Sequence, residues 1–96
     1  MGEILKQFDD AIARVTQDRG AVYGHPAEDF QRAYDLKGAV RECNHHLIRH
    51  ALEMICVKMA RLTKTPNHLD SIIDIAGYAR TMAMILDKEK EDHEQG

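Results

Sequence analysis

The sequence contains few of the residues that interrupt helices or form disulfide bonds. Its 96 residues include two prolines, six glycines, two cysteines and no tryptophan. Cys43 and Cys56 form no C-x-x-C motif, so we expect two free thiols that pack as small apolar side chains. Aromatic residues make up only 5% of the chain, and aliphatic side chains must therefore supply most of the core.

Long apolar runs and an excess of basic charge are also missing. No stretch approaches the roughly 18 apolar residues of a membrane span, and the first ten residues, MGEILKQFDD, lack the basic and apolar regions of a secretory signal. We therefore expect a cytoplasmic protein with no membrane contact. The net charge of −3 argues against general nucleic-acid binding, although a local Lys/Arg cluster would suffice for a small anion.

The hydrophobic pattern predicts helices throughout. Apolar residues recur at helical spacing in four segments, residues 3–18, 27–42, 45–64 and 68–88. The breaks carry Gly20, Gly24 and Pro26 before the second segment and Pro66 before the fourth. We expect an all-α, four-helix bundle in one domain, residues 1–88, and a charged tail, residues 89–96, that frays because it has no apolar residue.

The fourth segment is apolar around more than half of its circumference at about 100° per residue. Such a helix is central, buried either by its own domain alone or also by a second subunit. A chain this short buries too little surface for easy stability as a monomer. We therefore expect a homo-oligomer, with a central helix in a monomer as the alternative.

Four charged residues form the candidate site. Lys58 lies at the edge of the apolar arc of the third segment, and Arg61 follows one turn later. Asp70 and Asp74 lie one turn apart on the fourth segment, and the short break at residues 65–67 should bring the four side chains together. They could bind an anionic ligand, hold Mg²⁺ through the aspartates, or form an internal ion-pair network.

Other chemistry is less well supported. His46, His50 and Glu53 have the spacing of a transition-metal site, but they share a polar face without a further strong ligand, so a solvated face is favoured. Ser71 is the only serine, and the cysteines have no evident histidine partner beyond His45 and His46 beside Cys43. Nucleophilic catalysis is therefore not expected.

A family resemblance rests on four ordered motifs, YGHP at residues 23–26, KMARL at 58–62, HLDS at 68–71 and DIAGYA at 74–79. Together they resemble a group of small phage and prophage domains, which would place the protein in the host cytoplasm. This group is distantly similar to the MazG-type all-α nucleoside triphosphate pyrophosphohydrolases. The resemblance implies a dimeric or tetrameric bundle whose acidic residues on two helices hold Mg²⁺ against the phosphates of a nucleotide.

The sequence departs from the acidic motifs of that superfamily. E-x-x-E is expected on one helix and E-x-x-D on the next, but the first helix of the pair has Lys58 and Arg61 instead. In one hypothesis the protein is a divergent Mg²⁺-dependent pyrophosphohydrolase with Asp70 and Asp74 as metal ligands and catalytic residues. In the other it is a non-catalytic oligomer that sequesters a nucleotide-derived defence signal or binds a host protein. The ligand-binding residues expected in either case are Tyr23, Gly24, His25, Lys58, Arg61 and Tyr78.

Overall fold

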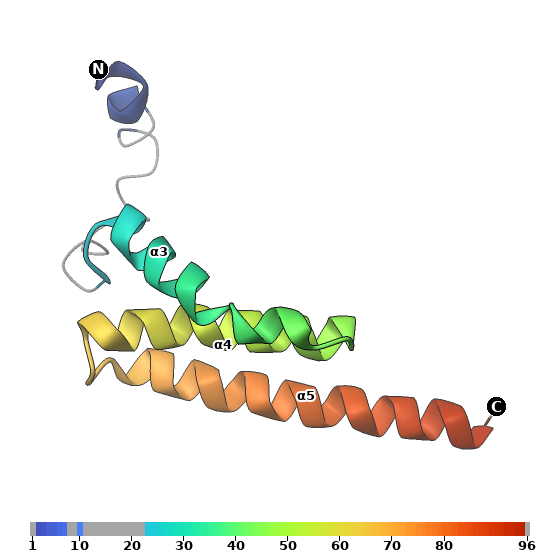
Figure 1. Ribbon diagram of the computed structural model, residues 1–96. Coiled ribbons are helices and arrows are strands. Elements are labelled where there is room, and N and C mark those ends of the chain that lie inside the picture. The colour runs from blue at the N-terminus through green and yellow to red at the C-terminus, as the bar shows by residue number, and fades with distance from the viewer. Residues whose placement is uncertain (1, 8–9, 11–22, 96) are drawn as a thin grey trace.

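The computed structural model describes residues 2–7, 10 and 23–95, and all the secondary structure in them is helical (Figure 1). The elements are α3 (Pro26–Leu36), the 3₁₀ helix η1 (Ala39–Glu42), α4 (His46–Lys64) and α5 (Leu69–Gln95). Residues 3–7 are helical too, whereas most of the remaining first predicted helix lies outside the described residues. The prediction of an all-α protein is confirmed.

The second predicted helix is interrupted. A single helix over residues 27–42 was expected, but α3 ends at Leu36 and the chain continues as η1. Gly38 lies at the break, where its conformational freedom disfavours a continuous helix. The guanidinium of Arg41 stacks over the ring of Tyr34, 4.6 Å from its centroid, and connects the two pieces.

The third and fourth predicted helices begin within one residue of their expected starts. The backbone N–H of Ile48 donates to Nδ1 of His45, which caps α4. Thr65 precedes Pro66 and leaves the helical region with φ −132° and ψ 81°, as a residue before proline tends to do. The chain then reverses, and α4 and α5 form an antiparallel hairpin (Figure 1).

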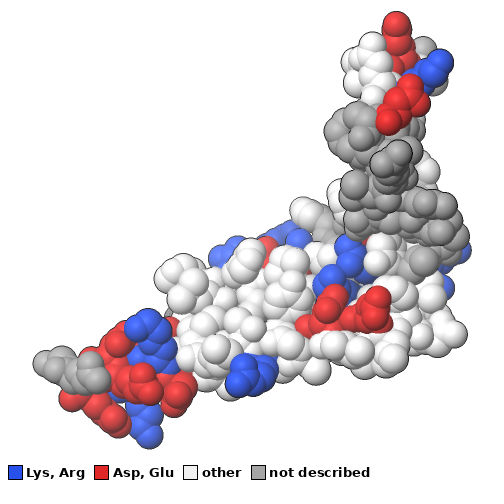
Figure 2. Space-filling view, turned by 180° about the vertical axis from the view of Figure 1, so that it is seen from behind, with Lys and Arg blue, Asp and Glu red and all other residues white. Residues whose placement is uncertain are grey.

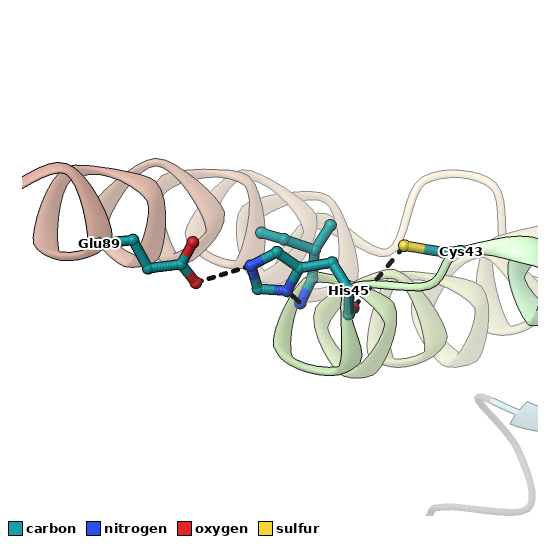
Figure 3. Close-up of polar contacts among 4 residues, drawn as sticks. Cys43, His45 and Glu89 are labelled. Carbon is teal, nitrogen blue, oxygen red and sulfur yellow. Dashed lines mark hydrogen bonds and ion pairs between the residues drawn. The ribbon is translucent and has the colours of Figure 1, made fainter. Parts of the chain in front are cut away.

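A frayed tail was expected over residues 89–96, whereas in the structure α5 continues to Gln95. The tail is held by charged contacts rather than apolar ones. Glu89 Oε1 lies 2.6 Å from Nε2 of His45 at the start of α4 (Figure 3), and Lys88 pairs with Asp92 one turn later. Cys43 donates to the His45 carbonyl in the same corner, at 3.7 Å.

The core of the described part is built from small side chains. Its buried apolar residues are Ala33, Ala51, Cys56 and Ala60, and no leucine, isoleucine, methionine or aromatic residue there is fully buried. Among the described elements α4 is the central helix, since it packs against both α3 and α5. The last helix was expected to be central, but within the described residues it packs mainly against α4, and they leave its apolar outer face uncovered. In the described residues, no helix is long and apolar enough to cross a membrane.

Candidate functional site

The predicted convergence of Lys58 and Asp74 is present in the structure. Nζ of Lys58 lies 3.0 Å from Oδ2 of Asp74 across the α4–α5 hairpin. The lysine side chain is 13% exposed and the aspartate 47%, so the ammonium is largely enclosed while the carboxylate faces solvent. The short turn at Pro66 sets this register, because it places the last turns of α4 beside the first turns of α5.

Arg61 contacts an aromatic residue rather than a carboxylate. Its guanidinium carbon lies 4.4 Å from the centroid of the Tyr23 ring, in cation–π geometry. The ring of His68 meets Tyr23 edge-on, with 5.6 Å between centroids. Arg32 of α3 adds a second guanidinium, since its Nη2 donates to the Tyr23 carbonyl at 3.2 Å. We refer to Tyr23, Arg32, Arg61 and His68 as the Tyr23 cluster.

Neighbouring residues hold the cluster in place. His68 Nδ1 and the hydroxyl of Ser71 are 2.7 Å apart, and Ser71 is only 1% exposed. Gly24 has φ +78°, a conformation that glycine adopts without steric cost, and the aliphatic part of Lys64 lies beside it. The chain at Tyr23 and Gly24 therefore lies against the end of α4.

Two guanidinium nitrogens in the cluster have unused hydrogen-bonding capacity. Nε of Arg32 and Nε of Arg61 are buried and have no acceptor among the described residues. Asp29, one turn before Arg32 on α3, is 4% exposed, and its Oδ1 has no donor. A buried donor without a partner costs about 1–3 kcal/mol relative to a satisfied one. The cluster therefore holds two buried donors that no described residue satisfies.

Three of the predicted site residues take other positions. His25 caps α3 by accepting the Ala27 N–H at its Nδ1, and it has a structural role there. Asp70 is exposed and Tyr78 half-buried on α5. Within the part of the chain that the structure describes, no hydrogen bond, ion pair or ring contact connects Asp70 or Tyr78 to the cluster.

The carboxylates do not form a closed metal cage. The described residues contain no group of three or more His, Cys, Asp or Glu side chains that could hold a metal ion. Asp74 is already paired with Lys58, which would compete with a cation for the same oxygen. Asp70 and Asp74 could hold Mg²⁺ only together with water and ligand phosphates, as Mg²⁺ sites with one or two carboxylates do.

Sequence reasoning missed Arg32, Asp29 and the role of His68. His68 was noticed only as part of a motif, although its spacing from Ser71 permits the observed contact. Asp29 and Arg32 lie three residues apart and hence on one face of α3, next to the buried Ala33. This face of α3 carries charged residues where a helix packed against a core usually carries apolar ones. That pattern is the sequence signal that could have indicated Asp29 and Arg32.

Comparison with known proteins places the chain among phage sequences. The family model described as "Domain of unknown function (DUF6378)" matches residues 3–86. A "Gene 55 protein" of Mycobacterium phage D29 is 34% identical over 84 residues, which cover 88% of this chain and 56% of that protein. The chain thus spans little more than half the length of this relative. No solved structure matches it.

Proposed function

The chain belongs to the DUF6378 family, and from the geometry of the Tyr23 cluster we propose that it binds an anionic small molecule without transforming it. The ligand class that we propose is a nucleotide or a nucleotide-derived signal. The relative in phage D29 is consistent with a role in the host cytoplasm, where such a protein would sequester a defence signal. A MazG-like bundle remains part of the proposal.

The observation that carries the proposal is the pair of buried, unpartnered guanidinium nitrogens beside an aromatic ring. Guanidinium groups bind phosphate oxygens through paired, charge-assisted hydrogen bonds. A phosphate at the cluster would satisfy donors of Arg32 and Arg61 that the described residues leave unused. Lys64, whose side chain lies beside Gly24, adds positive charge next to the cluster.

Lys58 contributes indirectly in this arrangement. It lies one turn before Arg61 on α4 and is paired with Asp74, so its charge is partly neutralised. An incoming phosphate would compete with the Asp74 carboxylate for the ammonium. Ligand binding therefore exchanges one ion pair for another, and the displaced carboxylate is already half exposed to water.

Calorimetry with nucleoside mono-, di- and triphosphates and cyclic nucleotides, with and without Mg²⁺, tests the proposal. Arg61→Ala should weaken binding about 10- to 100-fold, because a hydrogen bond to a charged group contributes about 1.5–3 kcal/mol. Arg49→Ala is the matched control: it removes the same charge from the same helix, where Arg49 pairs with Glu53. Equal effects of the two variants, or no binding of any nucleotide, would contradict the proposal.

A catalytic form of the proposal rests on Asp70 and Asp74, which lie one turn apart on the solvent side of α5. Mg²⁺ bound there would stabilise developing charge on the phosphates of a nucleoside triphosphate. In that case the protein releases pyrophosphate at millimolar Mg²⁺, and Asp74→Asn removes the release while nucleotide binding persists. If the unmodified protein binds nucleotides but releases no pyrophosphate, the catalytic form is excluded and only the binding function remains.

A further inference from the structure

The outer face of α5 carries an apolar stripe that nothing in the described chain covers. It follows a heptad-like spacing of three and four residues, and its members are Leu69, Ile72, Ala76, Ala79, Ala83 and Leu86. All six are exposed, and the three large side chains are 46–62% exposed. Such spacing is typical of the seam between two packed helices.

A second stripe with the same spacing faces α4. Its members are Ser71, Ile75, Tyr78, Met82 and Ile85, all buried or half-buried. At about 100° per residue the two stripes lie roughly 110° apart around the helix. A helix with two such stripes has the pattern of a bundle helix with two neighbours, and among the described elements α5 packs mainly against one, α4.

The uncovered face of α5 is long enough for an interface. A standard interface takes about 800 Å² from each partner, and α5 offers 27 residues along which such an area can be buried. Figure 2 shows a largely uncharged surface over the middle of the hairpin, interrupted by basic side chains at its lower edge and by an acidic patch right of centre, and a dense group of charged side chains at the left end.

We propose that α5 pairs with α5 of a second copy through this stripe, in antiparallel orientation around a two-fold axis at Ala79. In this register Ile72 of one copy lies opposite Leu86 of the other, and Ala76 and Ala83 come within about one residue, or about 1.5 Å along the axis, of facing each other. Ile72 then meets Leu86 on both sides of the axis, while alanines at the centre let the helices approach closely. Each copy uses the same surface, as a two-fold interface requires.

Charge favours the antiparallel orientation. The last turns of α5 carry five acidic residues and two lysines, Asp87, Lys88, Glu89, Lys90, Glu91, Asp92 and Glu94. The opposite end of the hairpin carries Lys58, Arg61 and Lys64 together with Asp70 and Asp74, so it has one more basic than acidic residue. A parallel pair would place two acidic tails side by side, whereas the antiparallel pair places each tail at the cationic end of the other copy. The helix dipoles also oppose each other in the antiparallel pair.

The mass in solution, measured by light scattering, is the first test. The unmodified chain should have twice the mass of 10.9 kDa, and Ile72→Asp should reduce it to that of one chain. Thr81→Asp is the control, because Thr81 is also exposed on α5 but lies outside the stripe; this variant should stay dimeric and helical. Ile72→Asp could dissociate and also lose helical dichroism. The stripe is then still required for the dimer, provided that Thr81→Asp keeps both the dimeric mass and the helical dichroism.

Disulfide trapping tests the orientation in a Cys43→Ser background. Ile72→Cys mixed with Leu86→Cys should form a mixed disulfide on mild oxidation. Ile72→Cys alone should not, since its two copies would be roughly 20 Å apart along the axis, beyond the reach of a disulfide. A monomeric wild type, as expected if residues 3–18 cover the stripe within one chain, would overturn the proposal. So would Ile72→Asp with unchanged mass, or efficient trapping of Ile72→Cys alone.

Discussion

A single imidazole joins the start of α4 to the last turns of α5. Nδ1 of His45 accepts the N–H of Ile48, so the ring proton is on Nε2, which donates to Glu89 at 2.6 Å (Figure 3). One neutral tautomer satisfies both contacts, and protonation of Nδ1 would remove the cap. The charged tail of α5 is thereby tied to the hairpin without apolar packing.

His45→Ala should lower the free energy of unfolding by about 1–2 kcal/mol, because it removes both a helix cap and a hydrogen bond. His45→Asn should cost less, since asparagine is a good N-cap residue and loses only the contact with Glu89. Urea denaturation of the two variants measures the difference. His50→Ala, an exposed change on the same helix, serves as the control and should leave the midpoint nearly unchanged.

The two thiols should differ in reactivity. Burial raises the pKa of the Cys56 thiol; Lys37 opposes this shift and Glu53 adds to it. A raised pKa means less thiolate at a given pH, and the thiolate is the reactive form. At pH 8 a thiol reagent should therefore modify the half-exposed Cys43 rapidly and Cys56 slowly until the chain is unfolded. A fast phase that survives in Cys43→Ser would contradict this assignment.

Replacing a glycine by alanine should have opposite effects on stability at two positions, one inside a helix and one in a non-helical segment. Gly77 lies inside α5, and a Cβ there would meet no atom within 4 Å, whereas Gly24 has φ +78°. Gly77→Ala should stabilise the protein by about 0.5–1 kcal/mol, because glycine is a poor helix residue. Gly24→Ala should destabilise it by roughly 1–2 kcal/mol through left-handed strain. Thermal unfolding of both variants measures the two changes in stability. Equal shifts in melting temperature would contradict the prediction.

The helices could be predicted from the sequence wherever apolar spacing and a proline break coincide. The bounds of α4 and the start of α5 follow from the apolar residues around Pro66. The end of α5 could not be predicted in this way, because Glu89 is held by His45, a residue 44 positions away in the chain. The break before η1 also depends on a contact, that of Arg41 with Tyr34.

The contacts of the candidate site could likewise be predicted only where they follow from two regular helices joined by a short turn. The pairing of Lys58 with Asp74 follows from the short turn that joins two regular helices. The stacking of Arg61 on Tyr23 depends on the path of an irregular segment, and the contribution of Arg32 depends on how α3 lies on α4. Neither contact follows from the helical spacing of residues within one segment. The sequence therefore indicated that Tyr23 belongs to the candidate site but not which residues contact it.

At the scale of the whole molecule, the lack of large buried side chains bears on how stability is achieved. The buried apolar residues of the described part are three alanines and a cysteine, which remove little apolar surface from water. In the proposed dimer, large apolar residues such as Ile72 and Leu86 contribute fully only once the second copy covers them. Folding should therefore be coupled to association.

The melting temperature should consequently rise with protein concentration. A tenfold increase in concentration adds about 1.4 kcal/mol to the stability of a dimer that unfolds to two chains. For an assembly of two 96-residue chains this corresponds to roughly 3–5 °C. Differential scanning calorimetry over a hundredfold concentration range measures the shift, and Thr81→Asp should show the same dependence as the unmodified chain. A melting temperature that does not change with concentration would mean that each chain is stable alone despite its small core.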